Sequence, residues 1–187
     1  MKKLIFTLLA IIFSNLNSYS EEIHFDNETY KLKFSAVAPQ TQGYGNEYFK
    51  ENENFSNWTK MIGIYYYPEE NNPIKYSQDF ANTIENTENS LLLKLIENNK
   101  TDKAIISLLV NREENSKKFF EYDVYKFEKS LFGGMIVSKY ATKNFFSSDS
   151  EIFNIAQEIK KYNDKYLELL IVSQTPKIIE KDVIIEN

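Results

Sequence analysis

The alternation of apolar and polar side chains predicts where the N-terminal half of this chain forms strands. Residues 30–38 alternate almost strictly, which is typical of a strand with one buried and one exposed face, and Pro39 follows them. Residues 58–67 are apolar on both faces, which predicts an inner strand covered on two sides or a strand with a helix on one face and a loop on the other. Residues 46–50 could add a short strand between these two.

A second group of strands lies in the C-terminal half. Residues 104–110, 119–129 and 135–146 are separated by polar turns, so they predict three successive antiparallel strands. Gly133 and Gly134 join the last two, and a hairpin turn rather than a ligand site is their expected role. The alternation within 119–129 slips by one residue after Val124, which predicts a β-bulge.

Apolar spacings of three and four residues predict two helices. The first, at about 73–98, begins with Pro73, where the missing N–H costs nothing. The polar stretch 86–89 leaves open whether 73–98 is one helix or two. The second, at about 150–171, is the clearest amphipathic helix, and Ser148 with Glu151 can form a capping box at its start.

These elements predict one α+β domain, an antiparallel sheet of about five to six strands packed with two main helices. Residues 21–187 are long enough to bury a single core, and the domain therefore spans this range. We expect a mobile N-terminus. The tail 174–187 could be a last strand or a loosely held extension.

The first 20 residues have the pattern of a cleaved signal peptide. Lys2 and Lys3 precede an apolar run over residues 4–13, and Ser18 and Ser20 are the small residues before a cleavage site near Ser20-Glu21. A transmembrane anchor is the alternative, but a bilayer requires about 20 apolar residues. We therefore expect a periplasmic or secreted protein, and the absence of cysteine favours a bacterial periplasm.

Charge and composition narrow the classes of function. The net charge is −5, and removal of Lys2 and Lys3 makes it −7, so nucleic acid and anionic lipid are poor partners. No later stretch is apolar enough to span a membrane. The lack of cysteine excludes thiol catalysis and cysteine-ligated metals, no glycine-rich phosphate loop is present, and we expect no cofactor.

Few residues are candidates for catalysis. His24 is the only histidine, and a position near the terminus favours a solvated side chain over a catalytic or metal-binding one. Glu121 and Asp123 alternate on one side of a strand, where paired carboxylates can serve as general acid and base. Exposed strand positions carry acids for solubility more often, so we expect no catalytic residue.

Aromatic side chains give the only suggestive surface. Trp58, the single tryptophan, and the tyrosines Tyr65, Tyr67 and Tyr76 form the candidate binding surface, because aromatic residues are enriched at binding hot spots. Aromatic residues are also ordinary strand residues. Packing in the core is therefore the competing interpretation.

The order of elements resembles a known class of exported proteins. Asn57-Trp58 leads into a strand, Pro73 starts a helix, and a three-strand meander turns at Gly133-Gly134, which is similar to the small α+β proteins of the PsbP-like class. The resemblance covers residues 30–172 at the level of topology. It implies an antiparallel sheet between helices and an accessory or docking role, and no functional residue carries over.

Three hypotheses for function follow. The first is an exported, periplasmic, non-enzymatic accessory or binding protein whose partner is another periplasmic or envelope protein. The second is a periplasmic immunity or inhibitor protein, in which Glu113-Glu114 match a basic active site. The third is an enzyme that uses carboxylates and tyrosines.

Overall fold

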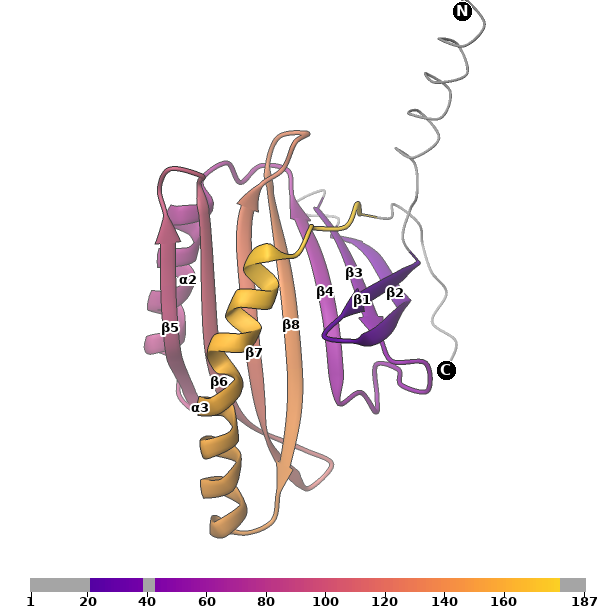
Figure 1. Ribbon diagram of the computed structural model, residues 1–187, viewed down its shortest axis with the longest axis vertical. Helices are drawn as coiled ribbons and strands as arrows, with labels where there is room; N and C mark the ends of the chain where they lie inside the picture. The colour runs from indigo at the N-terminus through magenta and orange to yellow at the C-terminus, as the bar shows by residue number, and fades with distance from the viewer. Residues whose placement is uncertain (1–20, 39–42, 179–187) are drawn as a thin grey trace, which may run out of the picture.

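The computed structural model describes residues 21–38 and 43–178 and shows one antiparallel sheet with two helices, an α+β fold (Figure 1). The predictions for the signal peptide, for Pro39 and for the end of the tail lie outside the described residues. The elements in chain order are β1 (Glu22–Phe25), β2 (Glu28–Ala38), β3 (Gly43–Phe49), β4 (Lys60–Tyr67), α2 (Pro73–Glu85), β5 (Ser90–Asn98), β6 (Lys103–Glu114), β7 (Lys117–Lys129), β8 (Met135–Phe146) and α3 (Asp149–Val172).

The sheet has eight strands in the order β1-β2-β3-β4-β8-β7-β6-β5, and the prediction of five to six strands was too low. The unpredicted strands are β1 and β5, one at each edge. β1 is only four residues long, and its hairpin turn places Asp26 and Asn27 at positive φ, 49° and 61°. Such a turn matches the twist of a two-stranded ribbon, which explains why so short a strand forms.

The predicted helix 73–98 was wrong in its second half. α2 starts at Pro73 as predicted, with Asn72 as N-cap, but it ends at Glu85. The chain then returns as β5, which has a bulge between Leu92 and Lys94. The extra residue places Leu92 and Leu95, three apart, on the same face of the sheet, so the strand imitates helical spacing.

The predicted meander of β6, β7 and β8 is confirmed, and its registers run without interruption. The predicted bulge in β7 was therefore wrong. Helices cover both faces of this strand: Tyr122 and Val124 pack towards α3, whereas Tyr125 and Phe127 pack towards α2. The apolar pattern slips after Val124 because the apolar residues before this point face α3 and those after it face α2.

The Gly133-Gly134 turn between β7 and β8 is also confirmed. Both residues have positive φ, 87° and 71°. A Cβ at Gly134 would lie 2.5 Å from the carbonyl oxygen of Tyr67, so this position requires glycine for space as well as for backbone conformation.

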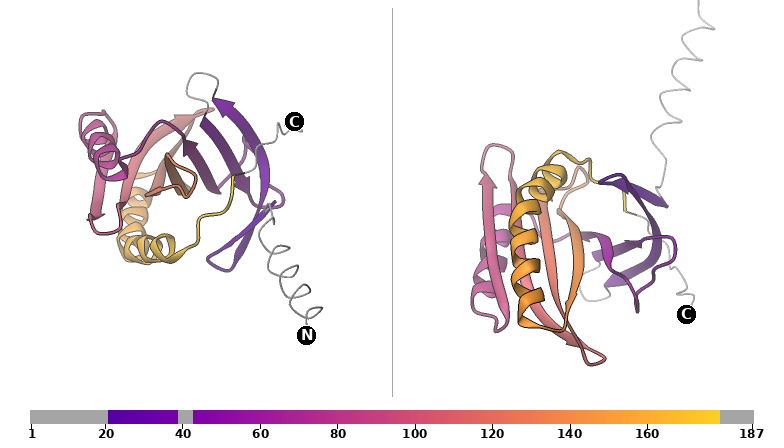
Figure 2. Two further views of the ribbon diagram at one scale, coloured as in Figure 1. Left: turned by 90° about the horizontal axis from the view of Figure 1, so that it is seen from above. Right: turned by 60° about the horizontal axis from the view of Figure 1, so that its bottom comes forward.

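The two helices lie on opposite faces of the sheet (Figure 2). On the α3-side face, the β1–β2 ribbon bends over, so that Phe25 packs 5.0 Å from Tyr140 and 6.4 Å from Tyr166 between ring centroids. The α2-side face carries a separate buried cluster around Ile106 and Phe127, which α2 covers over β5, β6 and β7. None of the described helices is long and apolar enough to cross a membrane.

The predicted helix at 150–171 is confirmed as α3, with Ser148 as its N-cap. The Ser148 side chain accepts a hydrogen bond from the Glu151 amide, as in a capping box. The return bond differs from that motif, because the Glu151 carboxylate accepts from the amide of Ser147, one residue earlier.

Candidate functional site

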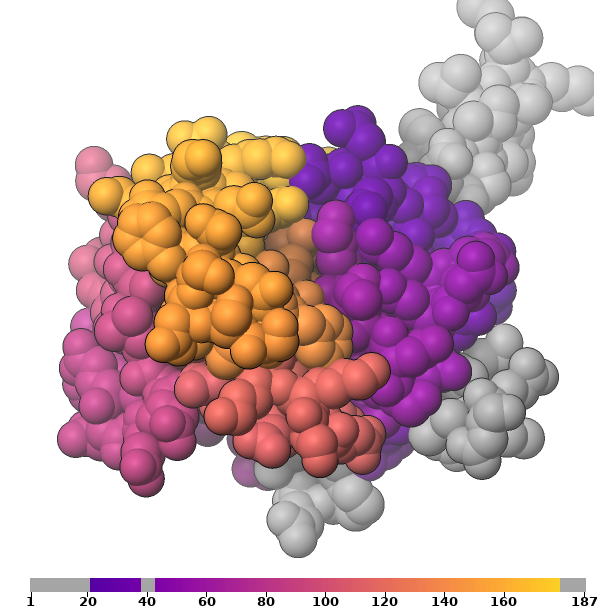
Figure 3. All heavy atoms as spheres, turned by 90° about the horizontal axis from the view of Figure 1, so that it is seen from below, coloured from indigo at the N-terminus to yellow at the C-terminus, as the bar shows by residue number. Residues whose placement is uncertain are grey.

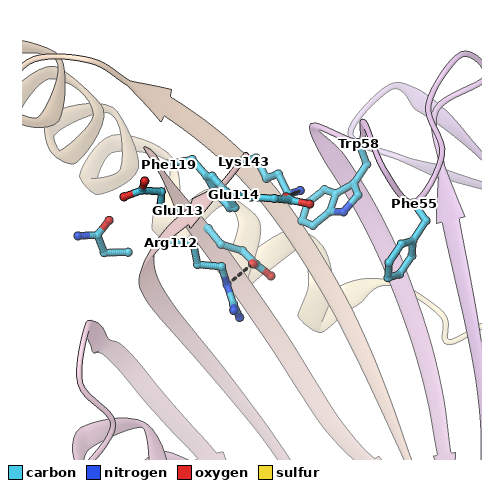
Figure 4. A pocket seen from close by; sticks show the side chains of 9 residues that line it. Phe55, Trp58, Arg112, Glu113, Glu114, Phe119 and Lys143 are labelled. Atoms are coloured by element: carbon cyan, nitrogen blue, oxygen red, sulfur yellow. Dashed lines mark hydrogen bonds and ion pairs between the residues drawn. The ribbon is translucent and has the colours of Figure 1, made fainter. Parts of the chain in front are cut away.

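A pocket of about 520 Å³ opens on the α2-side face, near the end of the sheet where β6 turns into β7 (Figure 4). It joins the loop before β4 to the ends of β6, β7 and β8. Figure 3 shows the β6–β7 turn, in salmon, beside purple atoms of the N-terminal half. The lining residues are Phe55, Trp58, Asn111, Arg112, Glu113, Glu114, Phe119, Glu121 and Lys143.

Lys143 organises the aromatic wall of the pocket. Its Nζ lies 4.4 Å from the ring centroid of Trp58 and 5.0 Å from that of Phe119. It also lies 3.0 Å from Oε2 of Glu114. A cation held by two rings and a carboxylate fixes the positions of all three, so this wall is formed before any ligand arrives.

The floor of the pocket carries an ion-pair network around two buried acids. Nε of Arg112 lies 2.6 Å from Oε2 of Glu121, and Nζ of Lys139 lies 2.9 Å from Oε1 of the same residue. Lys139 also approaches Oδ1 of Asp123 at 3.2 Å. The expectation that Glu121 and Asp123 are exposed was wrong, because they are only 6% and 2% exposed.

The two acids of this network differ in pKa. Burial favours the neutral form of both. At Glu121, the charges of Lys139 and Arg112 outweigh burial and hold the pKa below its usual range. At Asp123, burial and the neighbouring charge of Glu121 raise the pKa to about 6, against the opposing effect of Lys139.

This arrangement is suited to holding a charged group rather than to proton transfer. A general base needs a lone pair that faces the substrate. Both oxygens of Glu121 face cations of the protein, and Glu114 is paired with Lys143. The described residues contain no group of three or more His, Asp or Glu side chains that could hold a metal ion.

His24 lies far from the pocket in the order of the sheet. It belongs to β1, the edge strand opposite β5. Its Nδ1 is 3.0 Å from Oγ1 of Thr29 on the neighbouring strand. The structure therefore does not bring the only histidine to the acids of the pocket.

The four predicted surface residues do not form one surface. Trp58 lines the pocket and also packs against Phe49, with 6.4 Å between ring centroids. Tyr67 and Tyr76 contact each other at 5.7 Å and belong, with Tyr65, to the cluster beneath α2. For these three tyrosines, packing in the core was the better interpretation.

Tyr65 lies beside the ion-pair network rather than in the pocket. Its hydroxyl donates to Oε1 of Glu47 at 2.8 Å. Its ring lies across Gly63, where an added Cβ would be 2.5 Å from the hydroxyl oxygen. Burial raises the pKa of Tyr65 well above its usual range, so it remains a hydrogen-bond donor.

Sequence reasoning missed the two cations of the pocket, Arg112 and Lys143. Arg112 offered a signal, because it is the only arginine in a chain with 22 basic residues. A guanidinium has five donors in a fixed plane, which distinguishes it from a lysine at sites that bind carboxylates. Lys143 offered none, because the rings around it come from distant parts of the chain.

Comparisons with known proteins place the chain in a family. No curated protein and no solved structure matches it. The resemblance to the PsbP-like class therefore stays a prediction. A family model matches residues 18–175, which include every strand and helix described above. The chain therefore belongs to the protein family that this model describes.

Proposed function

We propose that the protein is an exported, periplasmic or secreted, non-enzymatic binding protein that holds a ligand or a segment of a partner protein in this pocket. The observation that carries the proposal is the combination of a preformed aromatic wall with a charged floor whose acids are already neutralised. Its volume of about 520 Å³ also falls within the range of about 300–1,000 Å³ that is usual for ligand pockets.

The chemistry of the lining supports a ligand with an apolar group and a carboxylate. Phe55 is 62% exposed and offers an apolar surface at the mouth. Arg112 uses Nε for Glu121, while about half of its side chain remains exposed. The other donors of the guanidinium can bind a carboxylate in the plane of the group. A peptide C-terminus or a small organic acid has these two features.

The pairing of the acids favours binding over carboxylate catalysis. Glu121 is paired with Arg112 and Lys139, which favours its ionised form, and Glu114 is paired with Lys143. An acid–base enzyme instead needs one acid that is protonated and one base that is free. Glu121→Gln should therefore leave any activity of the purified protein within about twofold, and a loss of 10²-fold or more would revive the enzyme hypothesis.

The pocket proposal is tested by a thermal-shift screen of residues 21–187 with short peptides and organic acids. A true ligand should raise the melting temperature, and Arg112→Ala and Phe55→Ala should each abolish the shift. Both side chains are largely exposed, so the variants should fold. The matched control is Lys118→Ala, an exposed cation on β7 outside the pocket lining. A ligand that binds both pocket variants as well as the wild type would overturn the proposal.

Export is tested separately by mass spectrometry of the protein recovered from the native envelope. The pattern of Lys2, Lys3 and the small residues before Glu21 supports a chain that begins at Glu21. Recovery of the chain with Met1 retained would contradict export by a cleaved signal.

A second candidate is an immunity or inhibitor protein, favoured by Glu113 and Glu114 at the rim of the pocket. Both residues are exposed, and Lys143 neutralises only Glu114. An acidic rim matches an enzyme with a basic active site. A pull-down with residues 21–187 tests this candidate. If it recovers an enzyme that the protein inhibits, and Glu113→Lys abolishes the inhibition, the protein is an inhibitor rather than an accessory protein.

A further inference from the structure

The turn between β7 and β8 exposes two large apolar side chains next to each other. Leu131 is 99% exposed and Phe132 is 78% exposed. Scattered apolar residues are normal on a surface, but two adjacent ones at the tip of a hairpin make a compact projecting feature. From the sequence, this turn is expected to have a structural role alone. We call Leu131 and Phe132, with the turn 130–134 that carries them, the apolar tip.

The apolar tip is held rigidly by hydrogen bonds within the turn. The amide of Ser130 donates to the carbonyl of Gly134 at 3.0 Å, and the amide of Gly133 donates to the carbonyl of Ser130 at 3.3 Å. The amide of Phe132 donates to Oγ of Ser130 at 3.1 Å. The backbone on either side of the two exposed side chains is therefore fixed.

A second segment supports the turn from outside. The hydroxyl of Tyr66 donates to the carbonyl of Gly133 at 3.1 Å, and the amide of Gly134 donates to Oδ1 of Asn71 at 3.3 Å. Gly134 also packs against the backbone of Pro68. Because the conformation is fixed in advance, docking of Phe132 costs little ordering of the chain, which is the property of a binding anchor.

The charges beside the apolar tip are acidic. Glu69 and Glu70 belong to the supporting turn and are exposed. Within residues 21–38 and 43–178, neither carboxylate is paired with a cation. The nearest lysine in sequence, Lys129, is neutralised by Asp102 at 2.6 Å. Lys75 also interacts electrostatically with Glu70, but it is paired with Asp79 at 2.5 Å, so the surface around Phe132 carries a net negative charge.

These charges select the kind of partner. An anionic membrane surface attracts basic residues around an inserted apolar group, and two glutamates there oppose insertion. A protein that presents an apolar pocket with lysine or arginine at its rim can bind both the apolar side chains and the negative charges. The observations therefore favour a protein partner over a lipid bilayer.

We propose that the apolar tip is a docking knob, in which Leu131 and Phe132 enter an apolar pocket with a basic rim on a partner protein and Glu69 and Glu70 pair with that rim. The knob is separate from the ligand pocket. β7 runs from Phe119, which lines the pocket, to Lys129 at the tip, a strand length of roughly 30 Å or more, and Figure 1 shows the two hairpins at opposite ends of the sheet. A knob at one end and a pocket at the other allow the protein to bridge two molecules.

The test uses the full chain in its native host with a benzophenone amino acid in place of Phe132. Irradiation should give one protein adduct, and the same amino acid in place of Glu88, exposed in the turn after α2, should not give it. The adduct protein is then purified and titrated with residues 21–187. Phe132→Ser should weaken binding at least about tenfold, and Glu69→Lys with Glu70→Lys should weaken it about three- to tenfold and abolish its dependence on salt.

Other outcomes overturn the proposal. Absence of an adduct, or binding that Phe132→Ser leaves unchanged, would show that the tip is not a docking site. Sedimentation with phosphatidylethanolamine–phosphatidylglycerol vesicles that depends on Phe132 would assign it to a membrane. An adduct between two copies of this chain would assign it to self-association. Arg112→Ala leaves the tip intact, so a failure of the pocket proposal is distinguishable from a failure of this one.

Discussion

Each face of the sheet carries a largely buried lysine, and the pKa values of these two lysines shift in opposite directions. On the α2-side face, Lys139 lies between Glu121 and Asp123. Burial opposes its charge, yet the neighbouring carboxylates raise its pKa well above the usual range. On the α3-side face, burial outweighs the attraction of Glu128 at 3.0 Å and lowers the pKa of Lys126.

This difference separates a site from a structural contact. Lys126 donates to the carbonyl of Ser173 at 2.9 Å, so it fastens the end of α3 to β7. Among the described residues, Lys139 makes no comparable contact with a helix. It pairs with Glu121, and Glu121 pairs in turn with Arg112, which lines the pocket. The acids on the α2-side face are therefore connected to the pocket, whereas the lysine on the α3-side face helps to hold a helix in place.

The largest expected effect comes from removing Lys139. Lys139→Met leaves Asp123 buried without a cation, and we expect a loss of roughly 3–5 kcal/mol in the free energy of unfolding at pH 7. Lys126→Met should cost less, about 1–3 kcal/mol, because Glu128 keeps Lys103 at 2.8 Å. Urea denaturation measures both variants. Equal losses of stability would mean that the two lysines contribute equally to folding, and the difference between the two faces would be contradicted.

A smaller effect is expected where Tyr65 lies across the α2-side face. Gly63→Ala places a methyl group within 2.5–2.7 Å of the Tyr65 ring and hydroxyl, so the ring must move and lose its bond to Glu47. We expect a cost of roughly 2–4 kcal/mol. Gly45→Ala is the control, because its Cβ would lie 3.2 Å from the same ring, and it should cost less than about 1.5 kcal/mol. Thermal unfolding that ranks the two variants in the reverse order would contradict this account.

Asp123 should make stability depend on pH. Its folded pKa of about 6 lies above the unfolded value near 3.9, so the folded state binds more protons between these two pH values. Its contribution to stability is therefore fully present below about pH 4 and is lost as the pH rises to about 6. Relative to the wild type, Asp123→Asn should gain roughly 2–3 kcal/mol between pH 4 and pH 7.

The control for this pH dependence is Asp102→Asn, an exposed aspartate paired with Lys129. Its difference from the wild type should change by less than about 1 kcal/mol over the same range. Chemical denaturation at several pH values gives both curves. A flat difference for Asp123→Asn would show that folding does not raise the pKa of this acid.

The smallest expected effect lies on the α3-side face. Tyr122 is fully buried, and its hydroxyl donates to Oδ1 of Asn163 on α3 at 3.0 Å. Tyr122→Phe removes this bond and should cost about 1 kcal/mol. Tyr66→Phe, which loses an exposed bond to Gly133, should cost less than about 0.5 kcal/mol. Thermal unfolding compares the two variants. A cost above about 3 kcal/mol for Tyr122→Phe would mean that polar contacts, rather than apolar packing, dominate the α3-side face.

The predictability of the fold follows from how local its signals are. The meander β6–β8 and the helix α3 were predicted because alternation, helical spacing and the glycine turn lie within short stretches. β5 was assigned to a helix because its bulge depends on pairing with β6, which the sequence does not display. β1 had a local signal in Asp26-Asn27 that was missed, because both residues favour the left-handed conformation of a hairpin turn.

The candidate site was predictable only in its individual residues. Trp58 and the pair Glu121 and Asp123 were named from the sequence, but with the acids taken as exposed. Their burial depends on Lys139, which comes from the next strand and pairs in register with Tyr125. Arg112 joins them from the preceding strand. A network that spans three strands exists only once the register is set, and no stretch of sequence contains it.

The bulge in β5 also bears on how the protein behaves at high concentration. β5 is the outermost strand of its side of the sheet, and Leu91 and Ile96 on it are exposed. A long regular edge of this kind invites another chain to add a strand and so begins aggregation. The extra residue between Leu92 and Lys94 breaks the regular spacing of the free backbone groups, and Lys94, paired with Asp164, adds charge at the same place. The irregularity that made this strand resemble a helix in the sequence therefore also makes its edge a poorer template for the addition of another strand.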